Sequence, residues 1–365
     1  MPSGRPLSAI VLAAGEGSRM KSERPKPLHF LCGRPMLMYV LDSLRGADPD
    51  RAVIVVGHKA ERVTQKIGGA ETALELEFVE QVVQRGTGDA VLVGLVGLPE
   101  DGEEDGDVLV LPGDAPLLRP GTISALVERH RSHDVAATVL TARLPDPAGY
   151  GRVIRGKDDR VVRIVEQRDA TDAELAVDEV NTSIYCFRRS VLAPALRRLE
   201  PDNAQGEYYL TDVIGVLSGA GYGIESLQVE DPIEAAGVND RLQLAEAEAE
   251  LRLRTNTDLA RNGVTMLDPS NTFVDTTVEV GRDVTLFPGT ILQGDTVIGD
   301  GSEIGPNTRL VDCAVGSGSV IENSTARQAT VGDGAVVGPY AALVPGTKLA
   351  DGFVTGPFYN SASEG

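Results

Sequence analysis

A glycine turn followed by basic residues is the first feature of the sequence that suggests chemistry. The stretch LAAGEGSRMKSERPK, residues 12–26, contains Gly15, Gly17, Arg19 and Lys26. Glycines let backbone N–H groups approach phosphate oxygens without a Cβ in the way, and nearby cations add charge. The stretch therefore fits a site for a phosphate-bearing ligand. Glycine turns after a first strand also have purely structural roles, so the turn alone leaves both interpretations open.

The amino-acid sequence of this turn does not match two common phosphate-binding motifs. A P-loop requires Gly-Lys followed by Ser or Thr, which the stretch does not contain. The dinucleotide-binding fingerprint requires a glycine where Met20 stands. Both a Walker-type ATPase and a nicotinamide-dependent dehydrogenase therefore lose support.

A carboxylate at the end of an apolar run is a candidate metal ligand. Asp114 closes the run DVLVLPGD, residues 107–114, which reads as a buried strand. At the carboxyl edge of a parallel sheet, such a carboxylate can face a ligand crevice and bind a hard cation. Closing a turn is the alternative role of this residue.

The composition narrows the classes of protein. The 365 residues carry a formal net charge of -20, which disfavours binding to a nucleic-acid backbone. No apolar run approaches the roughly 20 residues that span a bilayer, so we expect no membrane partner and a cytoplasmic protein. Cys32, Cys186 and Cys313 lie far apart, which predicts reduced and packed cysteines and no disulfide framework.

The first part of the chain, to about residue 230, alternates apolar runs with helical periods. The runs predict strands at 8–14, 51–57, 107–114, 135–144, 160–167 and 182–187. Apolar residues at spacings of three and four predict helices at 36–46, 88–98 and 122–131. This order predicts an α/β fold with a Rossmann-like, mostly parallel sheet covered by helices.

The period changes in the last third of the chain. A stretch from Asn239 to Gly263, rich in Ala, Glu, Leu and Arg, predicts a long connecting helix. After it, Ile or Val precedes Gly at separations close to multiples of six, which is typical of a parallel β-helix of hexapeptide repeats. A generic glycine-rich β domain is the alternative. The members of this repeat are Val280, Ile298, Ile304, Val315, Val331 and Val337.

Further motifs occur in a fixed order along the chain. They are QVVQRGTGDAV (81–91), LPGDAPLL (111–118), DPAGYGRVIR (146–155), RIVEQRDA (163–170), EVNTSIY (179–185), NAQGEYYLTDVI (203–214) and GVNDRLQLAEAE (237–248). Together with the glycine turn, they resemble the bacterial bifunctional N-acetylglucosamine-1-phosphate uridylyltransferase/glucosamine-1-phosphate acetyltransferase family over roughly residues 8–350. The resemblance implies a nucleotidyltransferase domain at 1–236, a connecting helix at 237–262 and a truncated left-handed β-helix at 263–365.

The resemblance implies that a sugar 1-phosphate attacks the α-phosphorus of an NTP and releases pyrophosphate. Because the sugar phosphate is already a nucleophile, alignment and charge neutralisation carry the catalysis. UTP, N-acetylglucosamine 1-phosphate and Mg²⁺ are the implied ligands. The implied site consists of Arg19 and Lys26 for catalysis; Leu12, Ala13, Ala14, Gly15, Gly17, Gln81, Gln84, Gly86 and Thr87 for the nucleotide; Gly151, Glu166 and Asn181 for the sugar; and Asp114 and Asn239 for the metal. Capping the following helix is the alternative role of Asn239.

Two positions depart from the family pattern near the substrates. Asp89 stands where the family has His in GTGHA, and Ser183 stands where it has Gly in NTG. These departures leave open the same reaction with another sugar or cyclitol phosphate, or with another NTP. A nonenzymatic sugar-nucleotide sensor or scaffold is the alternative of another class. The retention of Arg19, Lys26 and Asp114 favours the enzyme.

The second activity of the family, acetyl transfer from acetyl-CoA, is expected to be absent. Val344 stands where the family has an Arg in an RPG corner, and no His follows His133 in the sequence. The reaction would have neither its general base nor its phosphate-binding cations. By resemblance, the remaining coils are expected to serve as an oligomerisation element of a homotrimer.

Overall fold

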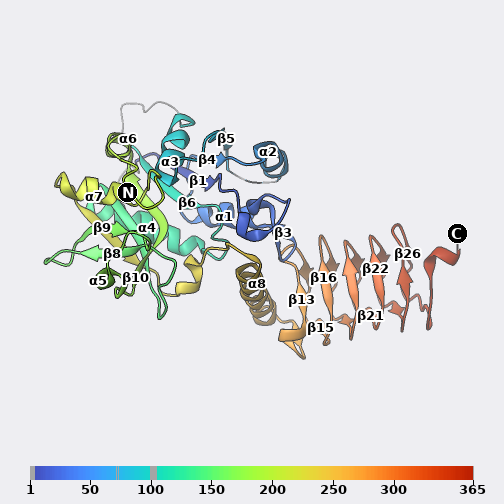
Figure 1. Cartoon of the computed structure of the whole chain (residues 1–365). Coiled ribbons are helices and arrows are strands. Elements are labelled where there is room, and N and C mark those ends of the chain that lie inside the picture. The colour runs from blue at the N-terminus through green and yellow to red at the C-terminus, as the bar shows by residue number, and fades with distance from the viewer. Residues whose placement is uncertain (1–4, 71, 73, 99–104, 365) are drawn as a thin grey trace. The chain divides into compact units, whose positions relative to one another are not determined.

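The computed structural model describes residues 5–70, 72, 74–98 and 105–364. The chain divides into two compact units (Figure 1). The first comprises Met1–His29 and Pro35–Gln243, and the second comprises Phe30–Arg34 and Leu244–Gly365. The division falls within the long helix α8, Arg241–Arg261.

A nine-stranded sheet forms the centre of the first unit, with the main order β11-β7-β10-β6-β1-β4-β5. The pairs of β1 with β4 and β6, of β4 with β5 and of β7 with β11 are parallel, which confirms the predicted mostly parallel sheet, although no strand was predicted at β5 or β11. β10 runs antiparallel to both β6 and β7, and β8 pairs with both β10 and β9. The strands are β1 Leu7–Ala13, β4 Arg51–Val56, β5 Leu76–Glu80, β6 Asp107–Pro112, β7 Ala137–Arg143, β8 Arg152–Arg155, β9 Val161–Val165, β10 Glu179–Arg188 and β11 Ile224–Gln228.

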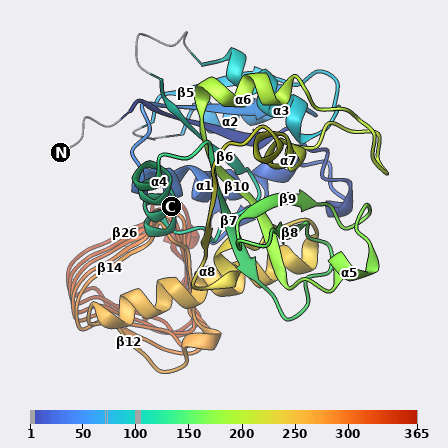
Figure 2. The same ribbon diagram turned by 90° about the vertical axis from the view of Figure 1, so that its left-hand side faces the viewer.

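Helices cover both faces of this sheet (Figure 2). Neighbouring residues of a strand point to opposite faces, so the continuous apolar runs of β1 and β4 bury both sides. Val11 and Ile54 pack with α1, α2 and α4, whereas Ile10 and Val53 pack with α3, α6 and α7. The helices are α1 Met36–Ser43, α2 Ala60–Gly68, α3 Thr87–Val96, α4 Pro120–His133, α5 Asp172–Leu175, α6 Arg189–Leu196 and α7 Asp212–Gly219.

Short parallel strands in three five-stranded sheets form the second unit, as in the predicted β-helix. The Val and Ile residues of the predicted repeat lie in these strands, and all except the half-buried Val280 are buried. The sheets are β12 Thr265–Met266, β15 Thr285–Leu286, β18 Glu303–Ile304, β21 Val320–Ile321 and β24 Val336–Val337; β13 Phe273–Val274, β16 Ile291–Gln293, β19 Arg309–Val311, β22 Thr325–Arg327 and β25 Ala342–Leu343; and β14 Glu279–Val280, β17 Val297–Ile298, β20 Ala314–Val315, β23 Thr330–Val331 and β26 Lys348–Leu349.

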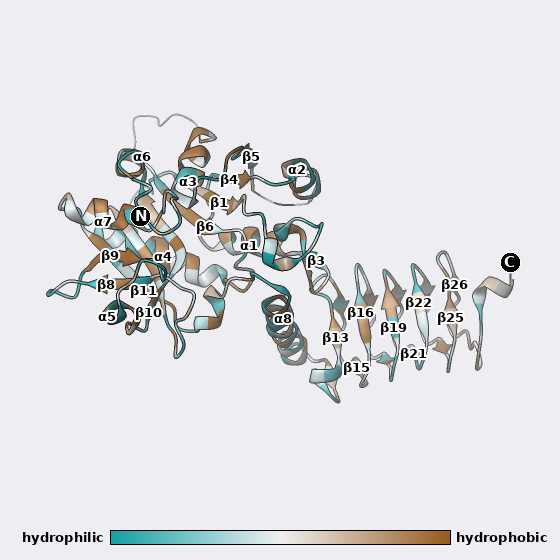
Figure 3. Cartoon of the chain, in the orientation of Figure 1, coloured by the Kyte–Doolittle hydropathy of each residue, from teal (hydrophilic) through white to brown (hydrophobic). Residues whose placement is uncertain are grey.

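The central strands of the sheet are more hydrophobic than the long helix α8 (Figure 3). Brown, hydrophobic residues concentrate on the central strands β1 and β6, whereas much of α8 is teal. Cys32, Cys186 and Cys313 are buried thiols, as predicted. Among the helices of the described residues, none has the length and hydropathy that crossing a bilayer requires.

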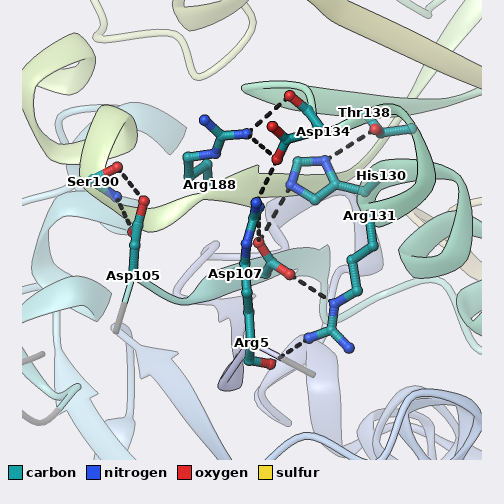
Figure 4. A network of polar contacts seen from close by, with 9 residues as sticks. All are labelled: Arg5, Asp105, Asp107, His130, Arg131, Asp134, Thr138, Arg188 and Ser190. Atoms are coloured by element: carbon teal, nitrogen blue, oxygen red, sulfur yellow. Dashed lines mark hydrogen bonds and ion pairs between the residues drawn. The ribbon is translucent and has the colours of Figure 1, made fainter. Parts of the chain in front are cut away.

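A network of charged residues surrounds Asp107, the first residue of β6 (Figure 4). The Asp107 side chain is fully buried, and its Oδ2 accepts a hydrogen bond of 2.8 Å from Arg131 Nε of α4. His130 Nε2 lies 3.5 Å from Asp107 Oδ1, and His130 Nδ1 lies 3.0 Å from Thr138 Oγ1. Burial raises the pKa of Asp107, but hydrogen bonds and charges from His130 and Arg131 outweigh it and hold the pKa below its ordinary value. The carboxylate thus ties the start of β6 to α4.

We predict that Asp107→Asn lowers the free energy of unfolding at pH 7 by about 3 kcal/mol, because it breaks a buried ion pair. A lowered folded pKa contributes stability above the unfolded pKa of about 4, and this contribution is lost as the pH falls through the folded value. Urea unfolding at pH 7 measures the change. Glu128→Gln, at an exposed position of α4, is the matched control. Equal stability of the two variants would contradict the conclusion that the buried Asp107 carboxylate stabilises the fold.

Candidate active site

A cavity of about 520 Å³ in the first unit brings the predicted site residues together. All of them line it except Gly17. The cavity lies at the carboxyl ends of the parallel strands, where open α/β sheets bind their ligands. The predicted residues in its wall are Leu12, Ala13, Ala14, Gly15, Arg19, Lys26, Gln81, Gln84, Gly86, Thr87, Asp114, Gly151, Glu166, Asn181 and Asn239.

The strand order separates the two groups of predicted ligand contacts. Gln81 and Gln84 follow β5, at one edge of the sheet, and Gly15 follows β1. Asn181 lies in β10, on the other side of β6, and Glu166 follows β9. Asp114 follows β6, between β1 and β10. The topology therefore places the predicted metal ligand between the predicted base and sugar contacts.

Four polar side chains converge at Asp114, in the loop between β6 and α4. Lys26 Nζ contacts Asp114 Oδ2 and donates a hydrogen bond of 2.9 Å to Asn239 Oδ1. Arg19 Nη2 donates to the same Asn239 oxygen, also at 2.9 Å. The Lys26 and Asp114 side chains are only 13% and 25% exposed, so this charge pair is poorly screened by water. The predicted cations and the predicted metal ligands form one cluster.

Backbone hydrogen bonds bring these distant segments together. Gly113 N–H donates to Leu12 O at 2.8 Å, which joins the loop after β6 to the end of β1. Val238 N–H donates to Asp114 O at 2.8 Å and brings the neighbouring Asn239 to the cluster. Asn239 N–H in turn donates to Gln243 Oε1 at 2.7 Å. Asn239 thus lies next to the start of α8 with its side-chain oxygen directed to Lys26.

The oxygens of Asp114 and Asn239 suit a hard cation. Both contact the same ammonium group, so a single positive charge already lies within reach of the two oxygens. Within the described residues, no group of three His, Cys, Asp or Glu side chains gathers as a metal site. One carboxylate and one amide would leave most of the coordination of Mg²⁺ to water and phosphate, which is its usual mode of binding.

The predicted base contacts are held by hydrogen bonds of their amide nitrogens. Gln81 Nε2 donates to Asp89 Oδ2 at 2.7 Å and to Gly86 O at 3.2 Å. Gln84 Nε2 donates to Ala14 O at 2.6 Å. In both side chains the amide nitrogen is bonded to the protein. Asp89, one of the two departures from the family pattern, is therefore in direct contact with Gln81, a residue predicted to bind the nucleotide.

The predicted sugar contacts lie around an irregularity of β10. The pairing of β10 with β7 shifts register between Asn181 and Tyr185. Asn181 Nδ2 donates to Tyr185 Oη at 2.8 Å, and Asn181 Oδ1 accepts from Ser183 N–H at 3.2 Å. Ser183 has a φ of 62°, in the left-handed region that favours glycine, and its exposed side chain lines the cavity. This conformation explains why glycine suits the position and shows that Ser183 adds a hydroxyl to the cavity wall.

Glu166 is a carboxylate in a poorly hydrated part of the cavity. Burial raises the pKa of Glu166, and the charges of Asp212 and Asp169 act in the same direction. A hydrogen bond of 3.1 Å from Thr211 Oγ1 to Glu166 Oε1 opposes this shift. Within the described residues no hydrogen bond reaches Glu166 Oε2, so the acceptance of a sugar hydroxyl by this oxygen stays a prediction.

The cavity also contains residues that the sequence did not single out. Tyr150 and Glu207 line its wall, within the motifs DPAGYGRVIR and NAQGEYYLTDVI. Burial and the nearby Asp114 carboxylate raise the pKa of Tyr150. Tyr150 and Glu207 could have been found only because they belong to these two motifs. The residue types did not indicate which residues of a motif face the cavity.

Comparison with known proteins decides the family. Residues 9–212 match the model of the MobA-like NTP transferase domain. The bifunctional protein GlmU of Streptomyces avermitilis is 46% identical over 350 residues, covering 96% of this chain and 72% of that protein. This chain belongs to the GlmU family. GlmU of Pelotomaculum thermopropionicum is also 46% identical, over 356 residues that cover 96% of this chain and 75% of that protein.

Membership of the GlmU family confirms the resemblance drawn from the motifs. Together with the NTP transferase match, it makes the chain a sugar-1-phosphate nucleotidyltransferase. The roles of individual GlmU-family residues remain predictions, to which the structure adds their common location in one cavity.

Gly17 contributes to the site without lining the cavity. Its φ is 64°, and a Cβ at this position would lie 2.7 Å from Lys26 Cβ. No real Cβ contact is that short, so any side chain here must displace the lysine or the turn. Glycine is thus required both for the left-handed backbone and for the position of Lys26.

We predict that Gly17→Ala lowers turnover at least about tenfold, because Lys26 is displaced and the left-handed backbone costs about 1–2 kcal/mol. Steady-state pyrophosphate release measures the effect. Gly121→Ala is the control, because its added Cβ meets no atom within 4 Å. Normal turnover of Gly17→Ala would show that the position of Lys26 does not depend on the absence of a side chain at residue 17.

Proposed function

We propose that this chain joins UTP to N-acetylglucosamine 1-phosphate in the presence of Mg²⁺, forming UDP-N-acetylglucosamine and pyrophosphate. The observation that carries the proposal is the single cavity in which the predicted base, phosphate, metal and sugar contacts meet. Across the sheet, the predicted base contacts come first, then the predicted metal ligand, then the predicted sugar contacts. In UDP-N-acetylglucosamine the uracil, the phosphates and the sugar follow one another in the same order. The expected cytoplasmic location stays a prediction.

The residues of the chain supply positioning and charge. Arg19 can contact two phosphate oxygens at once through its planar guanidinium, and Lys26 acts as a mobile point charge. The sugar phosphate arrives as an anion, so its attack on the α-phosphorus requires no general base. What the site must do is hold two anions in line for displacement of pyrophosphate.

Asp114 and Asn239 would hold Mg²⁺. The ion would neutralise charge on the phosphate oxygens that both substrates present. In the structure the same oxygens hold Lys26 Nζ, so binding of the metal-nucleotide requires the ammonium to move. The length and flexibility of a lysine side chain allow this movement, and the incoming phosphates provide its new partner.

Pyrophosphate release across a grid of NTPs and sugar 1-phosphates tests the substrates. We expect the highest kcat/KM for UTP with N-acetylglucosamine 1-phosphate. A hydroxyl of Ser183 in the cavity wall favours one alternative, another hexose or cyclitol phosphate, so these belong in the grid. Release with none of the pairs would contradict the enzyme and support a sensor.

We also propose that the β-helix has no acetyltransferase activity and serves self-association, as a trimer. Val344 stands at the corner where the family resemblance places an arginine, and its N–H donates to Ser361 Oγ at 3.0 Å. An aliphatic side chain at this corner cannot bind a phosphate. A coenzyme A release assay with glucosamine 1-phosphate and light scattering coupled to gel filtration test the two parts.

We predict that Asp114→Ala lowers turnover at least about a hundredfold, the scale of several kcal/mol of lost charge stabilisation. The variant should also lose the dependence of UTP affinity on Mg²⁺, measured by titration calorimetry. Asp158→Ala removes an exposed carboxylate from the turn between β8 and β9 and serves as the control. Near-normal turnover of Asp114→Ala would place the metal elsewhere.

A further inference from the structure

The orientation of the Gln81 amide is fixed by the protein. Its Nε2 donates to Asp89 Oδ2 at 2.7 Å and to Gly86 O at 3.2 Å. Gln81 N–H donates to Val56 O at 2.8 Å, which continues the pairing of β5 with β4 and holds the backbone. Only 5% of the residue is exposed. The side chain therefore has little freedom to adopt another conformation.

Both partners of the Gln81 amide nitrogen are acceptors only. A carboxylate and a backbone carbonyl have no hydrogen to donate, so a reversed amide would set Gln81 Oε1 against two oxygens. Within the described part of the chain, no protein group donates to Gln81 Oε1. The carbonyl end of the amide is thus the end left for a ligand in the cavity that Gln81 lines.

This orientation distinguishes pyrimidine bases by chemistry. At ring position 3, uracil carries an N–H donor, whereas cytosine carries a lone pair. A fixed carbonyl oxygen accepts from the first and repels the second. A freely rotating amide would serve both, because its NH₂ end can donate to cytosine.

We propose that Asp89 is a positioning residue that makes the site selective for UTP over CTP by fixing the Gln81 amide. The proposal rests on the proposed function and adds a determinant of its base specificity. Asp89 is half-buried and does not line the cavity, so it acts through Gln81 and not by touching the nucleotide. Asp89, where this chain departs from the family pattern, thereby takes part in the choice of base.

Asp89 also lies in the first turn of α3, where a carboxylate stabilises a helix through its dipole. A purely structural role would therefore change stability. It would leave the ratio of UTP to CTP use unchanged, and this ratio is the readout that separates the two roles.

The decisive variant is Asp89→Asn, which keeps the shape of the side chain but can donate as well as accept. We expect its ratio of kcat/KM for UTP to kcat/KM for CTP to fall at least about tenfold. The change should lie in KM, with kcat for UTP within about threefold of the wild type. Glu80→Gln, an exposed carboxylate next to Gln81, makes the same change in charge and should keep the ratio.

The outcomes distinguish this inference from the proposed function. An unchanged ratio in a folded Asp89→Asn variant overturns the inference, even if its melting temperature falls. If the wild type does not turn over UTP, the proposed function fails, and affinities for UDP and CDP measured by calorimetry test the same ratio. If Asp89→Asn does not fold, Asp89→Ser, whose hydroxyl can donate or accept, replaces it with the same expectation.

Discussion

The contact of Lys26 with Asp114 and Asn239 is the interaction on which the site depends. It joins residues from the loop after β1, the loop after β6 and the segment before α8 at one half-buried point. A lysine left alone in such a place would lose hydration without compensation. The carboxylate and the amide oxygen provide that compensation and hold the Lys26 side chain beside the space where the phosphates are proposed to bind.

One strand of the central sheet, β6, connects this cluster to a second group of charged residues at the other end of the strand. Asp107 at the start of β6 is anchored to α4 by Arg131 and His130, and Asp114 follows the end of the same strand. A rigid, buried β6 fixes the carboxylate in space, and its neighbours β1 and β10 set the distance to the base and sugar contacts. Position, and not an unusual chemical group, is what this fold supplies to the reaction.

The sequence predicted those elements in which the pattern of apolar residues matches the burial found in the structure. The runs of β1, β4 and β6 are apolar on both faces, and α8 has a long helical composition. No helix was predicted at α6, Arg189–Leu196, which contains Pro194 and buries Leu192. The elements α2, α5, α7, β5, β8 and β11 also lie outside the predicted segments. The reversed direction of β10 depends on pairings distant in sequence. The site residues were accessible through motifs, but the contact of Asp89 with Gln81 and the space that Gly17 leaves for Lys26 required coordinates.

A crystal structure with UTP and Mg²⁺ tests the account most directly. It should show the ion on Asp114 and Asn239, Lys26 Nζ moved from these oxygens onto phosphate oxygens, and the triphosphate against the Gly15 turn. An ion bound elsewhere, or a nucleotide bound while Lys26 still contacts Asp114 and Asn239, would contradict it.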